Sequence, residues 1–322
     1  MAELRFNPLT RDWVMIASHR QARPNMPKDW CPFCPGSGKV PDDFTVLKYD
    51  NDFPALSPMP PSPDEVGGGV YKTAPCYGKC EVILYSKNHT ATLPDLSDEH
   101  VSELVSLWRQ RFSALSEDKN HKYIFIFENR GELVGVSMPH PHGQIYAYPF
   151  IPKKLELETE SFRLHRKETE NCLLCDMLRE EEKFEKRIIF ENEAFTVFLP
   201  FFTEYPYGVY IAPKKCVRYI TDFTEKERFL LGQTIKRTVG MLDSLFDFPF
   251  PYMMCMHNAP VNTGDANDFH FHIEFFPPMR SGDKQKFNAS SETGAWAHCN
   301  PTAPEERAEE LRRAYKKFME KE

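Results

Sequence analysis

The segment Pro139-His140-Pro141-His142-Gly143-Gln144 has a counterpart in the second half of the chain, His270-Phe271-His272-Ile273-Glu274. Both segments place two histidines and a longer polar residue at every second position. In an extended segment alternate side chains lie on one face, so the three side chains of each copy point the same way. The recurrence of this unusual pattern indicates that the chain contains two copies of one structural unit.

Other features recur in the same order in both halves: a C-x-x-C pair, a segment that begins with asparagine, a polar turn, a helix-like stretch and a strand-like run. In the first half these are Cys31–Cys34, Asn51–Phe53, Ser86–Ser97, 98–113 and Tyr123–Phe127; in the second half they are Cys172–Cys175, Asn192–Phe195, Pro213–Thr224, 225–242 and Tyr252–Met256. We therefore predict an α+β fold of two duplicated units, each a mostly antiparallel sheet with one long helix. The expected units are residues 1–155 and 156–322, divided near a proline followed by a charged segment.

The composition is that of a globular protein, since 41% of the 322 residues are hydrophobic and 27% are charged. A formal net charge of -7 argues against a protein that binds nucleic acid by neutralising many phosphates, but it allows a local site for a small nucleotide. No apolar run approaches the roughly 20 residues of a membrane helix, and the N-terminal segment lacks the apolar stretch of a secretory signal. We expect a cytoplasmic protein with no nucleic-acid or membrane partner.

The chain has nine cysteines, four of them in two C-x-x-C pairs, which favours metal binding over disulfides. Zinc prefers four tetrahedral nitrogen or sulfur ligands. The register of the repeat predicts one set in each unit: Cys31, Cys34, His89 and His140, and then Cys172, Cys175, Cys216 and His270. Neither set leaves an open coordination position, so both metals are expected to be structural. The alternative is that the pairs are ordinary buried thiols.

If His140 binds metal, His142 and Gln144 are left to face a substrate. A neutral imidazole is a competent nucleophile at phosphorus when a hydrogen bond, for example to a backbone carbonyl, fixes its tautomer. Gln144 can stabilise negative charge on a phosphoryl oxygen but cannot supply a full proton. That combination suits a leaving group that is already good, such as a sugar 1-phosphate. The alternative is that both histidines bind one structural metal.

Several segments together carry a resemblance: Asn7-Pro8-Leu9-Thr10, Trp13, His19-Arg20, Arg23-Pro24, Asn51-Asp52-Phe53-Pro54, Phe127-Glu128-Asn129, Gly135 with Ser137, and His140 to Gln144. With them the chain resembles the galactose-1-phosphate uridylyltransferase family of the histidine-triad superfamily, from about residue 4 to about residue 315. That family is itself built from two histidine-triad-like units, as the repeat indicates independently. The resemblance implies that His142 takes UMP from UDP-glucose, releases glucose 1-phosphate and passes UMP to galactose 1-phosphate in a ping-pong reaction.

The resemblance also implies which residues bind the substrates. The nucleotide residues would be Arg20, Arg23, Asn51, Asp52, Phe53, Asn129, Gly135 and Ser137. The sugar residues would be Lys286, Phe287, Glu292 and His298, although an aromatic residue and a glutamine of the family pattern are replaced here. The family brings this tail to the partner subunit's site, so we expect a homodimer.

Some family members bind a second metal with a glutamate and three histidines. The corresponding residues here are Glu158, His257, His272 and Glu274, so a carboxylate replaces one histidine. This set, with zinc or iron, is the alternative to the cysteine-rich site of the second unit.

Two other functions fit the same motif. One is a nucleotide-sugar phosphorylase or adenylyl transferase, such as an ADP-glucose phosphorylase, which would use His142 with another base or acceptor. The other is a zinc-stabilised nucleotide-binding, hydrolase-like protein of the histidine-triad type with no sugar substrate. The tail 286–300 favours an enzyme that binds a sugar, because a small binding protein has no need of it.

Overall fold

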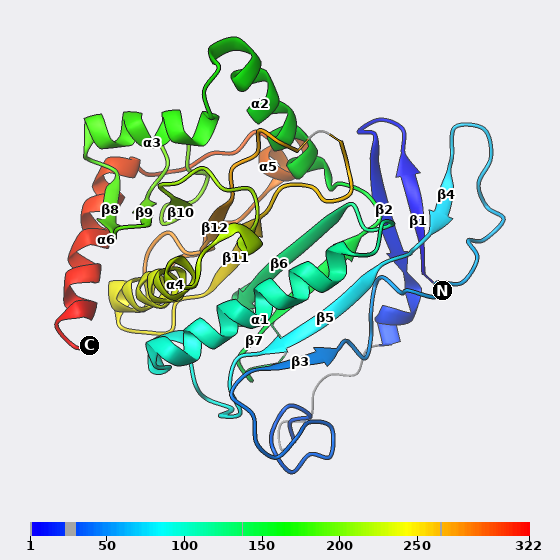
Figure 1. Cartoon of the computed structure of the whole chain (residues 1–322), viewed down its shortest axis with the longest axis horizontal. Coiled ribbons are helices and arrows are strands. Elements are labelled where there is room, and N and C mark those ends of the chain that lie inside the picture. The colour runs from blue at the N-terminus through cyan, green and yellow to red at the C-terminus, as the bar shows by residue number, and fades with distance from the viewer. Residues whose placement is uncertain (1, 23–29, 137, 265) are drawn as a thin grey trace.

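The computed structural model describes residues 2–22, 30–136, 138–264 and 266–322. Most strands lie in one antiparallel sheet with the order β3-β5-β7-β6-β11-β12-β10-β9-β8 (Figure 1). Its first half consists of β3 (Leu47–Asp50), β5 (Lys79–Leu84), β7 (His142–Tyr148) and β6 (Tyr123–Arg130). Its second half consists of β11 (Tyr252–His257), β12 (His272–Phe276), β10 (Tyr210–Pro213), β9 (Phe195–Phe198) and β8 (Ile188–Glu191).

The two halves are copies that join edge to edge. Strands β6 and β11 pair antiparallel, from Tyr252 opposite Arg130 to Met256 opposite Ile126. On either side of this junction lie β7 and β12, the strands that begin within the two histidine segments. The predicted α+β fold of duplicated, mostly antiparallel units is therefore confirmed. The division after residue 155 stays a prediction; that residue lies in the first turn of α2.

The helices complete the described structure. They are α1 (Asp98–Ser116), α2 (Lys153–Thr169), α3 (Leu173–Phe184), α4 (Glu225–Phe246), α5 (Ser290–Ala295) and α6 (Pro304–Met319), with short 3-10 turns η1 (Ser18–Ala22), η2 (Leu93–Asp95), η3 (Glu132–Val134) and η4 (Ile220–Asp222). A separate three-stranded sheet contains β1 (Ala2–Asn7), β2 (Asp12–Ala17) and β4 (Thr73–Pro75). None of the described helices combines the length and the apolar character that crossing a membrane requires.

The long helices α1 and α4 are the predicted helix of each copy, and both lie across one face of the large sheet (Figure 1). Each begins at a hydroxyl cap, since Ser97 accepts a hydrogen bond from the amide of His100 and Thr224 accepts one from the amide of Glu227. The helices approach closely at Gly232, where a Cβ would lie 3.3 Å from the backbone of Val101.

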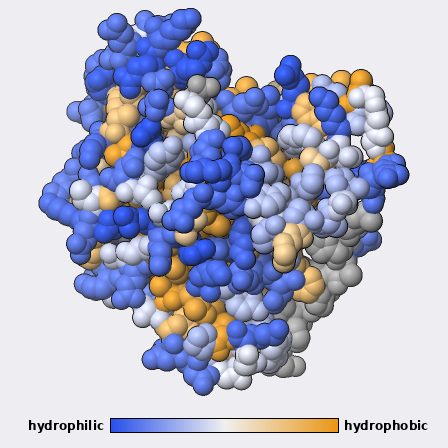
Figure 2. All heavy atoms as spheres, turned by 45° about the vertical axis from the view of Figure 1, so that its right-hand side comes forward, coloured by the Kyte–Doolittle hydropathy of each residue, from blue (hydrophilic) through white to orange (hydrophobic). Residues whose placement is uncertain are grey.

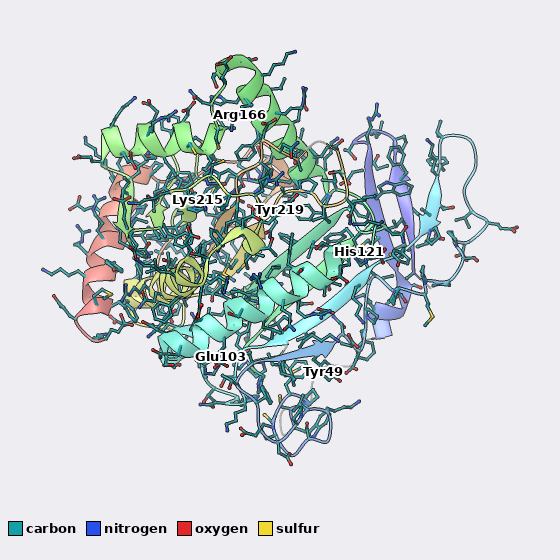
Figure 3. All side chains as sticks on the ribbon, viewed as in Figure 1. Tyr49, Glu103, His121, Arg166, Lys215 and Tyr219 are labelled. Atoms are coloured by element: carbon teal, nitrogen blue, oxygen red, sulfur yellow. The ribbon has the colours of Figure 1, made fainter. Side chains whose placement is uncertain are left out.

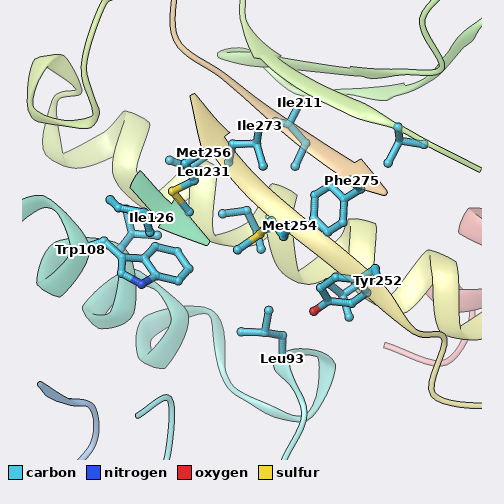
Figure 4. Close-up of a cluster of buried hydrophobic side chains, with 14 of the residues drawn as sticks. Leu93, Trp108, Ile126, Ile211, Leu231, Tyr252, Met254, Met256, Ile273 and Phe275 are labelled. Carbon is cyan, nitrogen blue, oxygen red and sulfur yellow. The ribbon is translucent and has the colours of Figure 1, made fainter. Parts of the chain in front are cut away.

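One hydrophobic core lies under these two helices (Figure 4). Trp108 of α1 and Leu231 of α4 are fully buried against side chains of the central strands, such as Ile126, Met254 and Phe275. Hydrophilic residues cover most of the face that Figure 2 shows, with small apolar patches between them. The shared core holds the two copies as one body and fixes β7 in place.

Strand β7 approaches its neighbour so closely that it needs a glycine. Gly143 pairs with Ile83 of β5, and a Cβ at Gly143 would lie 2.3 Å from Oη of Tyr85. Tyr85 is buried and packs edge-on against Trp108, with ring centroids 5.7 Å apart. The hydroxyl therefore cannot move aside without displacing core residues.

We predict that Gly143→Ala lowers the free energy of unfolding by about 1–3 kcal/mol, because the added methyl overpacks a filled site. Tyr85→Phe in the same chain should recover part of this loss, since Oη is the nearest atom to the new Cβ. Urea unfolding of the three proteins measures both effects. A Gly143→Ala protein as stable as the wild type would contradict the packing described here.

Candidate active site and metal clusters

His142 is the first residue of β7, and its ring is fixed by the preceding histidine of the segment. Its Nδ1 lies 2.8 Å from the backbone oxygen of His140. A carbonyl oxygen can only accept a hydrogen bond, so Nδ1 carries the proton and the lone pair lies on Nε2. The ring is half-buried and lies beside Phe33, with ring centroids 5.9 Å apart. This is the tautomer that a nucleophilic histidine requires.

Gln144 lies two residues further along β7, on the same face as His142. The hydroxyl of Tyr146 donates to Oε1 of Gln144 over 3.2 Å. With its oxygen held in this way, the amide of Gln144 has its NH2 group as the end that can donate to a phosphoryl oxygen.

A cavity lies in front of these two residues. It is lined by Pro32, Phe33, Tyr49, Asn51, Asp52, Phe53, Val82, Met138, His142 and Gln144. The loop after β3 thus brings three of the expected nucleotide residues, Asn51, Asp52 and Phe53, to the histidine. Asn51 is held by accepting from the amide of Phe53 over 2.9 Å. Burial, with the Asp52 carboxylate to which its hydroxyl donates, raises the pKa of Tyr49 to about 12 (labelled in Figure 3), so this group stays a neutral donor.

Three of the other expected nucleotide residues, Asn129, Gly135 and Arg20, are among the described residues. Asn129, near the end of β6, lines a second cavity of about 310 Å³ that also contains His142. Gly135 directly follows η3 with φ 80°, a left-handed conformation that favours glycine. Arg20 lies in η1, and its positive charge acts on the Cys80 thiol of β5. Burial raises the pKa of this thiol, and the charge of Arg20 opposes part of the rise. Arg23 and Ser137 lie outside the described residues.

Phe33 and Tyr49 were not anticipated as site residues from the sequence. Phe33 is the third residue of the first C-x-x-C pair, and its ring lies 6.0 Å from His140 and 5.4 Å from Tyr49. The signal for Phe33 was its place in a turn that is predicted to bind metal, together with the segment that is predicted to hold the nucleophile. Tyr49 carries no such signal, because one aromatic residue in a short strand has no distinctive spacing.

The fold brings the four residues of the first predicted metal set close together. The ligand atoms of Cys31, Cys34, His89 and His140 all lie within 4.8 Å of one another. Sγ of Cys34 is 3.3 Å from Nδ1 of His89 and 3.7 Å from Nδ1 of His140. A tetrahedral zinc ion with ordinary bond lengths gives sulfur–nitrogen separations of roughly 3.6 Å. Nε2 of His140 donates to the backbone oxygen of Ser86 over 2.8 Å, so Nδ1 presents its lone pair to the cluster.

The second predicted set forms an equivalent cluster in the other copy. Cys172, Cys175, Cys216 and His270 also gather their ligand atoms within 4.8 Å. Sγ of Cys172 lies 3.3 Å from Nδ1 of His270, whose Nε2 donates to the backbone oxygen of Pro213. The donor set and the orientation of the histidine fit zinc as well as in the first copy.

The alternative second set forms as well. Glu158, His257, His272 and Glu274 bring their ligand atoms within 4.8 Å in a cluster distinct from the cysteine-rich one. His272 donates from Nδ1 to the backbone oxygen of His270 over 3.0 Å, as His142 does to His140. We call this group the Glu–His cluster. Two imidazoles and two carboxylates are a donor set that suits zinc or iron, so in this fold the two sets expected as alternatives are compatible.

The expected sugar residues lie in the tail that follows β12. Lys286 is buried, with Nζ 3.9 Å from Oε1 of Glu292 and 5.0 Å from the centre of the Tyr205 ring. His298 lies 3.3 Å from Glu204, and Phe287 is 70% exposed. None of these tail residues lines either of the two cavities that contain His142.

Comparison with known proteins places the chain in a family. It matches the family model for galactose-1-phosphate uridyl transferase, N-terminal domain, over residues 1–152 and the model for the C-terminal domain over residues 158–315. A galactose-1-phosphate uridylyltransferase of Thermotoga maritima is 41% identical over 314 residues, which cover 97% of this chain and 98% of the relative.

Solved structures agree with this placement. The structure of a uridylyltransferase matches with a TM-score of 0.91 at 30% identity, over 98% of this chain and 99% of that one. An ADP-glucose phosphorylase from Arabidopsis thaliana, solved with bound ADP-glucose, shares the fold with a TM-score of 0.73 at 23% identity, over 97% and 99% of the two chains. From its sequence and its fold, this chain belongs to the galactose-1-phosphate uridyl transferase family.

Proposed function

We propose that the protein transfers UMP from UDP-glucose to galactose 1-phosphate through a uridylyl intermediate on His142. The observation that carries this proposal is the hydrogen bond from Nδ1 of His142 to the backbone oxygen of His140, which places the lone pair on Nε2. The same ring lines a cavity with Gln144 and the three residues of the Asn51–Phe53 loop. The likeness to the Thermotoga maritima uridylyltransferase supports these substrates.

The proposed reaction has two displacements at one phosphorus atom. Nε2 of His142 attacks the α-phosphorus of UDP-glucose, a P–N bond forms, and the P–O bond to glucose 1-phosphate breaks. The leaving group departs as a phosphate ester and needs no proton, which agrees with an amide at Gln144. The imidazole becomes positively charged, and the carbonyl of His140 stabilises it through Nδ1–H. A phosphate oxygen of galactose 1-phosphate then attacks, the P–N bond breaks and His142 returns to its neutral form.

The roles of the other residues follow from their positions. Arg20 and Arg23 would neutralise phosphate charge, with Ser137 and Asn129 as further hydrogen-bonding partners and Gly135 shaping the loop beside them. Asn51, Asp52 and Phe53 would bind the uridine. The tail residues Lys286, Phe287, Glu292 and His298 would bind the sugar in the partner subunit's site of a homodimer, since in one chain they do not line the two described cavities at His142.

The two cysteine-rich clusters would hold structural zinc, and the Glu–His cluster would hold zinc or iron. A zinc ion in the first cluster would fix the ring of His140, whose own carbonyl orients His142. The gathering of the two C-x-x-C pairs into candidate metal clusters supports a cytoplasmic location. The adenylyl alternative has weaker support, because the neighbour with bound ADP-glucose is only 23% identical and shows the fold alone.

The covalent step can be tested by mass. Incubation with UDP-glucose and no acceptor should add one UMP to the chain, and His142→Asn should abolish the addition because it removes the attacking nitrogen. His165→Asn is the matched control, since His165 lies in α2 and pairs with Asp176. Intact-mass spectrometry gives the result. A wild-type protein that gains no UMP, or a His142→Asn protein that does, would rule the proposal out.

Gln144→Ala should lower kcat by about 10²–10³-fold, because it removes one donor to the phosphoryl oxygen in the transition state. The KM for UDP-glucose should change far less, since the uridine contacts of the Asn51–Phe53 loop remain. Steady-state rates with both substrates measure the two constants. If kcat stays at the wild-type value, Gln144 has no part in stabilising the transition state.

Cys31→Ser should lose one metal equivalent per chain, because it removes one of four ligands of the first cluster. The matched control is Cys299→Ser, since Cys299 is exposed and belongs to none of the three clusters. Elemental analysis of the purified proteins gives the metal content. Unchanged zinc in Cys31→Ser would show that this cluster is not a zinc site.

A further inference from the structure

The Glu–His cluster lies where three elements meet. Glu158 belongs to the first half of α2, His257 ends β11, and β12 contributes His272 and Glu274. His257 and His272 are direct partners in the pairing of β11 with β12. His272 and Glu274 are two residues apart on one strand, so their side chains point to the same face. Glu274 thus occupies in the second copy the position of Gln144 in the first.

Each carboxylate of the cluster has one oxygen near the histidines. Oε2 of Glu158 lies 2.8 Å from Nδ1 of His257 and 3.9 Å from Nε2 of His272. Oε1 of Glu274 lies 3.4 Å from Nε2 of His272 and 3.7 Å from Nδ1 of His257. These separations bracket the roughly 3.3 Å between nitrogen and oxygen ligands of a tetrahedral ion. The four ligand atoms are therefore close enough to one another to bind one ion.

The other oxygen of each carboxylate faces Lys154. Nζ of Lys154 lies 2.5 Å from Oε2 of Glu274 and 3.8 Å from Oε1 of Glu158. Lys154 and Glu158 are one turn apart in α2, which brings both side chains to the same helix face. Nζ also lies 4.7 Å from the centre of the Phe276 ring, which fixes its place beside β12. The lysine is thus outside the group of four ligand atoms and bonded to it through Glu274.

Charge explains why this lysine is needed. Glu274 is only 1% exposed, and a carboxylate oxygen left unpaired at such a site costs free energy. A histidine at this position would be neutral and would carry no second acceptor atom. A glutamate adds one negative charge and one extra oxygen, and the ammonium group of Lys154 compensates for both. Outer partners of this kind commonly orient the ligands of a metal ion.

We propose that Lys154 is a positioning residue of the Glu–His cluster: it binds Oε2 of Glu274 and so presents Oε1 as the fourth ligand of a divalent transition-metal ion. This inference rests on the metal-binding role proposed above for the cluster. It has a specific consequence. Lys154 matters most for metal affinity while residue 274 is a carboxylate, because a neutral imidazole needs no compensating cation and the contact of Lys154 with Glu158 is longer, at 3.8 Å.

The test is a double-mutant cycle on metal affinity. Zinc affinity of the cluster is measured by competition with a chromophoric chelator in wild type, Lys154→Met, Glu274→His and the double variant. Lys154→Met should weaken binding by about 10–100-fold. The same change in the Glu274→His background should have a much smaller effect, because only the 3.8 Å contact of Lys154 with Glu158 remains. Lys153→Met is the matched control, since Lys153 pairs with the exposed Glu156 in the same turn and should bind zinc as the wild type does.

The measurements distinguish two negative outcomes: that Lys154 does not position Glu274, and that the Glu–His cluster binds no metal. His257→Asn removes a ligand, so a wild-type protein that holds no more metal than His257→Asn would show that the cluster binds none, and both proposals would fall. If His257→Asn loses metal but Lys154→Met binds as tightly as the wild type, only the role of Lys154 is overturned. An equal loss from Lys154→Met in both backgrounds would also overturn it, because the effect would not act through Glu274.

Discussion

The hydrogen bond between the backbone oxygen of His140 and Nδ1 of His142 connects the two halves of the proposed chemistry. His140 uses its ring in the cysteine–histidine cluster and its carbonyl to orient the next histidine along the strand. Because the ring of His140 is held by Ser86 on one nitrogen and faces the cysteines with the other, its backbone has little freedom. The tautomer and direction of His142 therefore depend on a cluster that has no direct part in the proposed reaction.

The same histidine-to-carbonyl hydrogen bond occurs in both copies, but the side chains around it differ. His272 donates to the backbone oxygen of His270 just as His142 does to His140, so both copies place an Nε2 lone pair on one face of a strand. The residue two positions after each histidine, Gln144 or Glu274, determines which groups lie near its Nε2. Gln144 leaves space for a substrate beside His142, whereas Glu274 closes the equivalent position into a group of four ligands. One copy is thus suited to phosphorus chemistry and the other to a metal ion.

Much of this could be read from the sequence, because the repeat supplied long-range information that single motifs lack. It predicted the duplicated α+β fold, the long helices α1 and α4, and both cysteine–histidine sets, including His89 and Cys216, which have no motif of their own. It did not show that the cysteine-rich and Glu–His sets of the second copy form separate clusters, since that depends on where α2 lies against β11 and β12. The contributions of Phe33 and Lys154 were also hidden, because both arise from contacts between elements distant in the chain.

The central claim is that UMP is covalently bound to the protein between the two half-reactions. Isotope exchange tests it most directly: labelled glucose 1-phosphate is incubated with UDP-glucose and the protein, with no galactose 1-phosphate. A uridylyl intermediate can return UMP to the labelled sugar phosphate, so the label should enter UDP-glucose at a rate comparable to that of the complete reaction. No exchange under conditions in which the complete transfer proceeds would contradict the account.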